Sequence, residues 1–119
     1  MPDPRVTKLA QVLVRYSLDL QPGQQLHLRA SPLAEELSLA VYKDAVLAGA
    51  HVHLGIGLPG AEEVFFKNAS DAQLDFVSPV RRLITETFDA TLYIEAEHNT
   101  RELAGVDGDL FYKDGKFAV

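Results

Sequence analysis

The run from Gly55 to Gly60 (GIGLPG) matches the G-x-G-x-x-G pattern that holds the pyrophosphate of a dinucleotide between a strand and a helix. Asp75 follows at about the distance that the pattern requires. Other residues argue against this function. Pro59 removes a backbone donor, and Glu62 and Glu63 place two negative charges where the pyrophosphate would bind. The run also follows the second predicted strand rather than the first, so we interpret it as a structural turn.

Histidines and carboxylates suggest metal binding at two further places. His51 and His53 alternate with apolar residues on a predicted strand, so both imidazoles point to one face and can share a metal. Local spacing supplies no third ligand, and we favour partly exposed packing residues. The run from Glu95 to His98 offers two carboxylates and an imidazole near the end of another strand. Glu95 and Glu97 share a face only if the strand continues that far, and His98 then points away.

A ligand-binding edge is predicted where the strands end. If the strands are parallel, right-handed crossovers bring their carboxyl ends to one edge of the sheet, where open α/β folds bind ligands. Arg29 and Arg101 would suit a carboxylate such as a peptide C-terminus, because a guanidinium donates two hydrogen bonds to it. Ion pairs of these arginines with nearby glutamates are the competing interpretation. The candidate residues at this edge are Arg29, Glu97, His98, Asn99 and Arg101.

Helix caps and hydrophobic periodicity define the elements that position these residues. A capping residue followed by proline occurs at Asp3, Ser31 and Ser78, and each predicts the start of a helix. In the helix after Ser78, Val80, Leu83 and Ile84 are expected to point inward. Helices are predicted over residues 4–18, 33–48 and 62–68, as a short turn opened by the capping box at 70–73, and from 79. Strands are predicted over 25–30, 51–57 and 91–95.

This alternation of helices and strands predicts an α/β fold. We expect an open layered sheet, mainly parallel, with helices on both faces, in a domain covering residues 1–105. Residues 106–119 form a divergent tail with the pattern of a β-hairpin. A two-residue turn at Asp114-Gly115 pairs four residues on each side of it. The expected pairs are Lys113 with Lys116, Tyr112 with Phe117, Phe111 with Ala118 and Leu110 with Val119.

Composition narrows the classes of function. The 119 residues include no cysteine, which excludes thiolate catalysis and sites built on sulfur, and the formal net charge is -6. Because no segment carries a basic run, nucleic acid and anionic membrane are poor partners. The N-terminus lacks the pattern of a signal peptide, and no apolar run reaches the roughly 20 residues of a membrane span. We therefore expect a cytoplasmic protein.

Several short segments together resemble a known family. The segments DPR (3–5), LA (9–10), VLV (12–14), YSL (16–18), QPG (21–23), SPLAE (31–35), AGAH (48–51), LPG (58–60), ASDAQL (69–74), FVSP (76–79) and EHNTR (97–101) carry the resemblance. Their order and spacing resemble the N-terminal domain of M29 metallo-aminopeptidases of the aminopeptidase T type. The resemblance implies a cytoplasmic, homodimeric peptidase family that uses two divalent metals.

In that family, the metal ligands lie in a large C-terminal domain, and we expect this chain to end before it. The resemblance therefore assigns no catalytic, cofactor-binding or metal-binding residue here. The leading hypothesis is a peptidase-family protein that serves as a non-catalytic binding or assembly domain, or is a truncated aminopeptidase. One alternative is a small nucleotide- or anion-binding α/β domain. Another is one subunit of a split metallo-aminopeptidase with a separate catalytic chain. A homodimer, and a peptide as ligand, are the expected partners.

Overall fold

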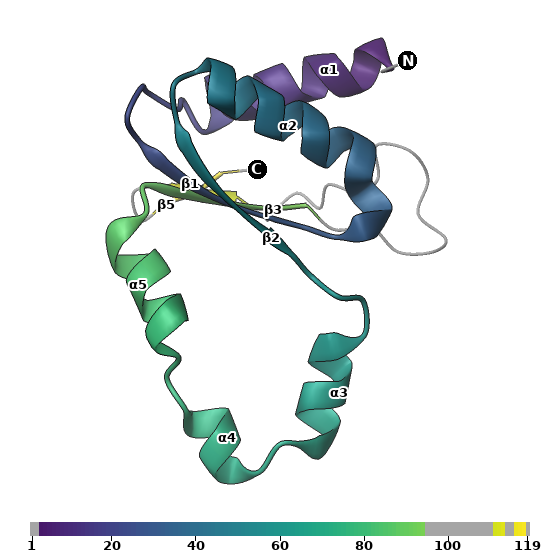
Figure 1. Cartoon of the computed structure of the whole chain (residues 1–119), viewed down its shortest axis with the longest axis vertical. Coiled ribbons are helices and arrows are strands. Elements are labelled where there is room, and N and C mark those ends of the chain that lie inside the picture. Colours follow the sequence, from purple (N-terminus) through teal and green to yellow (C-terminus); the bar gives the residue numbers. More distant parts are fainter. Residues whose placement is uncertain (1–2, 95–110, 114–115, 119) are drawn as a thin grey trace.

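The computed structural model describes residues 3–94 and the backbone of two short strands at 111–113 and 116–118. The order of helices and strands confirms the predicted α/β fold (Figure 1). The elements are α1 (Pro4–Gln11), a π-helical turn η1 (Val12–Ser17), β1 (Gln25–Ala30), a 3-10 turn η2 (Pro32–Ala34), α2 (Glu35–Leu47), β2 (His51–Ile56), α3 (Ala61–Asn68), α4 (Asp71–Asp75), α5 (Pro79–Thr87), β3 (Ala90–Ile94), β4 (Phe111–Lys113) and β5 (Lys116–Ala118).

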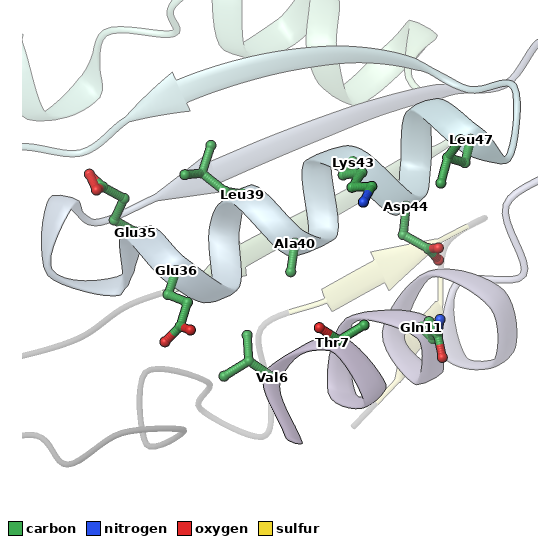
Figure 2. A pocket seen from close by; sticks show the side chains of 10 residues that line it. All are labelled: Val6, Thr7, Gln11, Glu35, Glu36, Leu39, Ala40, Lys43, Asp44 and Leu47. Carbon is green, nitrogen blue, oxygen red and sulfur yellow. The ribbon is translucent and has the colours of Figure 1, made fainter. Parts of the chain in front are cut away.

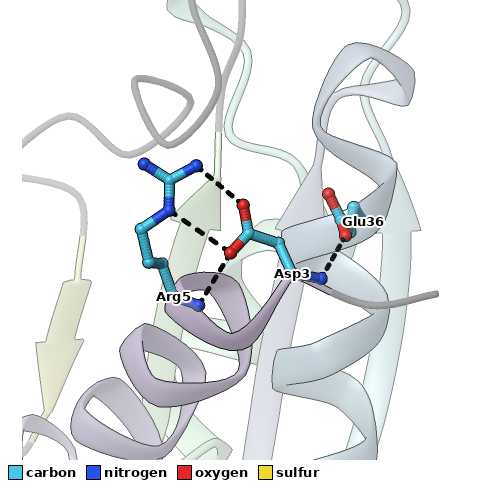
Figure 3. A network of polar contacts seen from close by, with 3 residues as sticks. All are labelled: Asp3, Arg5 and Glu36. Atoms are coloured by element: carbon cyan, nitrogen blue, oxygen red, sulfur yellow. Dashed lines mark hydrogen bonds and ion pairs between the residues drawn. The ribbon is translucent and has the colours of Figure 1, made fainter.

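The predicted helix caps are present. The Asp3 carboxylate accepts a hydrogen bond from the Arg5 backbone N–H at 2.8 Å, and it also pairs with the Arg5 guanidinium. These contacts with Arg5 hold the pKa of Asp3 below its ordinary value. Figure 3 shows that the backbone N–H of Asp3 also donates to Glu36 at 3.0 Å, which ties the start of α1 to α2. Three other side chains accept backbone N–H bonds as caps: Ser31, Ser70 and Ser78.

The strands form one sheet in the order β2-β1-β3-β4-β5. β1 pairs in parallel with both β2 and β3, so the mainly parallel sheet is confirmed. β4 pairs antiparallel with β3 and with β5. The hairpin has the predicted register, with Phe111 opposite Ala118 and Lys113 opposite Lys116. The turn at 114–115 and the pair at 110 and 119 lie outside the described residues.

The core lies between the sheet and the first two helices. Leu26 and Leu28 of β1 and Leu92 of β3 are fully buried beneath α1, η1 and α2. Val14 of η1 and Val41 of α2 are also fully buried and meet them from the helical layer. The helices bury these residues because their apolar side chains recur along one helical face. One face of the sheet is therefore closed.

The other side of the sheet is different. Figure 1 shows α3, α4 and α5 on the side of the sheet opposite α1 and α2, where they extend away from the strands. None of these three helices buries a residue. The prediction that Val80 and Leu83 point inward is wrong, because they are 66% and 60% exposed, while Ile84 is half-buried. Their helix stands off from the sheet, so the apolar side chains have no core to enter.

No helix within the described residues has the length and apolar character needed to cross a membrane.

Candidate ligand-binding face

The sheet face that α1 and α2 leave uncovered carries polar and aromatic side chains. Successive strand residues point to opposite faces, so the residues that alternate with the buried leucines point to this one. The parallel register places His27 beside His53 on one side and beside Thr91 on the other. The strand residues on the uncovered face are Gln25, His27, Arg29, His51, His53, Gly55, Thr91 and Tyr93.

His27 lies at the centre of this face and is only 9% exposed. Its ring centroid is 5.7 Å from that of His53, 6.1 Å from Phe88 and 6.3 Å from Tyr93. Nδ1 of His27 is buried and has no hydrogen-bond partner within the described part of the chain. Burial lowers the pKa of His27, and the positive charges of His53 and Arg29 lower it further. His27 is therefore a neutral imidazole at pH 7.

Two glycines beside these side chains each have room for a methyl group at ordinary contact distance. A Cβ at Gly55 would lie 3.7 Å from Nε2 of His27 and would meet nothing else within 4 Å. A Cβ at Gly57 would lie 3.4 Å from Nε of Arg29. The third glycine of the run, Gly60, has a φ of +88° and turns the chain into α3. The glycine-rich run thus forms a turn, as interpreted from the sequence, and its first two glycines also leave space on the uncovered face.

The predicted edge is described only in part. The carboxyl ends of the three parallel strands lie together, and Arg29 is one residue from the end of β1. No hydrogen bond or ion pair joins the Arg29 guanidinium to another side chain of residues 3–94. The other members of the predicted edge, at positions 97, 98, 99 and 101, lie outside the described residues. Their gathering around Arg29 stays a prediction.

His51 and His53 lie on the same face of β2, as their alternation with apolar residues predicts, and both are exposed. His53 contacts His27 of the neighbouring strand, and His51 lies one strand period earlier. Residues 3–94 contain no group of three or more His, Cys, Asp or Glu side chains placed to hold a metal ion. His27 does not stand out in the sequence, and only the parallel pairing of β1 with β2 places it beside His53.

The family model for Thermophilic metalloprotease (M29) matches residues 2–117 of the chain. The chain belongs to the M29 family. The match extends beyond the predicted domain of residues 1–105 and includes β4 and the first two residues of β5. No curated protein matches the chain.

The M29 chain also has a hollow on its closed side, between α1 and α2 (Figure 2). It encloses about 520 Å³ and is lined by Val6, Leu39, Ala40 and Leu47 together with charged side chains. Asp44, the buried acid of this hollow, pairs with Arg15 at 3.0 Å. The Asp44 carboxylate of this hollow is therefore already partnered.

Proposed function

We propose that this M29-family chain is a non-catalytic assembly domain of a peptidase, which associates with a second copy of itself through the helical arm formed by residues 58–87. One observation carries the proposal. Nine large apolar side chains of the arm each expose at least 42% of their surface. These side chains are Leu58, Val64, Phe65, Phe66, Leu74, Phe76, Val77, Val80 and Leu83.

So many exposed apolar residues on neighbouring helices favour association. Monomers rarely leave apolar patches larger than a few hundred Å² uncovered, and larger patches mark interaction sites. Within the arm, Phe65 and Phe66 pack edge to face at 5.4 Å between ring centroids, yet both remain exposed. Burying such side chains in an interface contributes roughly 25 cal/mol per Å² of apolar area. The resemblance to a homodimeric family also supports association.

Charge complementarity favours a second copy as the partner. Glu62 lies in the first turn of α3 and Arg81 in the first turn of α5. Neither forms an ion pair within the described residues, whereas Glu63 pairs with Lys67 and Arg82 pairs with Glu86 inside their own helices. A two-fold interface presents the same patch twice, so Glu62 of each copy can meet Arg81 of the other.

Light scattering of the purified chain at high micromolar concentration tests the assembly. We expect a dimer for the wild type and a monomer for Phe66→Glu, because the new charge would be buried in the interface. Leu39→Glu is the matched control, since Leu39 is 60% exposed on α2, on the other side of the sheet. That control should remain dimeric. A monomeric wild type, or a dimer that Phe66→Glu leaves intact, contradicts the proposal.

Charge reversal tests the pairing of the two copies. Glu62→Arg and Arg81→Glu should each weaken the dimer, because each places like charges opposite one another. The double variant exchanges the two charges and should restore the wild-type affinity. A double variant that is no tighter than either single variant would show that these side chains do not meet across the interface.

An activity assay tests the non-catalytic part of the proposal. With added cobalt or zinc, the purified chain should not hydrolyse leucine or phenylalanine anilides, and elemental analysis should find no stoichiometric metal. The expectation rests on the family resemblance, which places the metal ligands in another domain. Two metals per chain, or metal-dependent turnover that survives repurification, would overturn it.

A further inference from the structure

We propose that the uncovered face of the sheet binds a small oxyanion, a carboxylate or phosphate group, between the Arg29 guanidinium and Nε2 of His27, above Gly55 and Gly57. This site is separate from the assembly role of the arm. The two donors come from the same strand, and the two glycines come from the neighbouring strand and its continuation. All four positions belong to the described residues.

The protonation of His27 makes it a donor at this site. The neutral imidazole carries its single proton on one nitrogen, and the other nitrogen is an acceptor. A proton on Nδ1 would be a buried N–H with no partner within the described chain, and orphaned N–H groups are rarer than under-satisfied acceptors. The proton therefore belongs on Nε2, the atom that a Cβ at Gly55 would contact at 3.7 Å.

The same argument disfavours a metal ion shared by His27 and His53. Coordination through Nε2 of His27 requires the lone pair on that atom and the proton on Nδ1. Metal-bound histidines normally donate that second N–H to a carboxylate, a backbone carbonyl or water. Nδ1 of His27 has no such acceptor in the described residues. An anion that accepts the Nε2 proton avoids this penalty.

The space available suits an oxyanion. Residues two apart on a strand are about 6.6 Å apart along it, so the two donor residues, His27 and Arg29, project from points of β1 with about that separation. A single group with two acceptor oxygens can span it, because each charge-assisted contact covers about 2.8 Å. The backbone N–H of Gly57 donates to the Ala30 carbonyl at 2.8 Å, which keeps this glycine in register with β1.

The local charge also attracts an anion. Arg29 places a permanent positive charge on this face, and that charge helps to depress the pKa of His27. No carboxylate of residues 3–94 forms an ion pair with Arg29, although the chain as a whole has a net charge of -6. Phe88 and Tyr93 stand edge-on to the ring of His27 and provide a flat apolar border for the organic part of a ligand.

Histidine side-chain NMR of the full chain tests this site with inorganic phosphate and with acetate, at constant ionic strength set by sodium chloride. We expect the imidazole nitrogens of His27 to shift and to saturate. Arg29→Gln should weaken the binding about tenfold, the usual effect of losing one hydrogen bond to a charged group. Lys8→Gln removes the same charge from exposed Lys8 on α1 and should change nothing. Saturation by phosphate alone would identify a phosphate site, and saturation by both a general oxyanion site.

A glycine substitution tests the space separately from the charge. Gly55→Ala adds a methyl group at ordinary contact distance from Nε2 of His27, 3.7 Å, so the fold should tolerate it while the anion loses room. Ile56→Ala alters the next residue, which is 62% exposed and points to the opposite face, and it should bind normally. Phe66→Glu on the arm should also bind normally, so this test and the assembly test fail independently.

Three results would overturn the proposal. Equal phosphate shifts in Arg29→Gln and Lys8→Gln would show non-specific screening. Binding that Gly55→Ala leaves unchanged would place the anion elsewhere. Titration with zinc that shifts both His27 and His53 at stoichiometric concentration, while phosphate shifts neither, would replace the oxyanion site with a metal site.

Discussion

At the residue scale, the burial of His27 makes the stability of the fold depend on pH. Burial first, and then the positive charges of His53 and Arg29, lower its pKa from the ordinary value of 6.5. The unfolded chain therefore takes up a proton at higher pH than the folded chain. Wherever the unfolded state binds more protons, stability rises with pH. The contribution of His27 is thus present above about pH 6.5 and is lost as the pH falls from there towards the folded pKa.

Urea unfolding between pH 7.5 and 5 should reveal this effect. The wild type should lose stability on acidification, and His27→Phe should lose less, because phenylalanine fills the site without titrating. His51→Gln, at an exposed position on the same face, is the control and should keep the wild-type slope. The remaining charged and titratable groups of the face are His53, Arg29 and Tyr93, and all are retained in both variants. Equal slopes for wild type and His27→Phe would show that His27 is not the titrating group.

At the element scale, α2 packs against the covered face of the sheet with only one side of the helix. Leu37 is 5% exposed and belongs to the core, whereas Leu39, two residues on, is 60% exposed and lines the hollow beside α1. Two positions on one helix thus carry the same side chain in opposite surroundings. The difference arises because residues two apart project about 200° from each other around a helix axis.

The same substitution at these two leucines should have very different effects. Leu37→Ala should lower the free energy of unfolding by about 2 to 5 kcal/mol, since it removes buried methyl groups and leaves a cavity. Leu39→Ala should change it by less than about 0.5 kcal/mol, as is usual at exposed positions. Urea denaturation at pH 7 measures both. Comparable losses would mean that the exposed side of α2 is covered in solution.

At the scale of the whole molecule, the arm extends the chain beyond a compact shape. The Cα radius of gyration is 15.0 Å, against about 13.5 Å expected for a compact domain of this length. Figure 1 shows α3, α4 and α5 as the outlying part, with α4 farthest from the sheet. The apolar side chains of the arm do not enter the core of their own copy. Association with a second copy would bury them.

Thermal unfolding should therefore depend on protein concentration. Dimerisation stabilises the folded state by mass action, so Tm should rise between about 5 and 200 μM protein for the wild type. The Tm of Phe66→Glu should stay constant over the same range, and that of Leu39→Glu should rise as in the wild type. A wild-type Tm that is independent of concentration would count against a self-associating domain.

The sequence determined the helix starts, the strands and their parallel pairing through local chemistry. Asp3, Ser70 and Ser78 cap the helices where their types and spacing predict, because a side-chain oxygen reaches a backbone N–H only two or three residues away. The alternation of polar and apolar residues predicted the strands. The two-residue turn expected at 114–115 predicted the hairpin register. The order of helices and strands then required parallel pairing, since a crossover joins strands that run in one direction.

Only the tertiary structure decided which faces are covered. Val80 and Leu83 have the spacing of a buried helical face, yet they are exposed because their helix stands off from the sheet. His27 has the position of an outward-facing polar strand residue, yet it is buried by His53, Phe88 and Tyr93 from other parts of the chain. Periodicity reports which side chains share a face. Burial depends on what packs against that face, and residues far away in the sequence supply it.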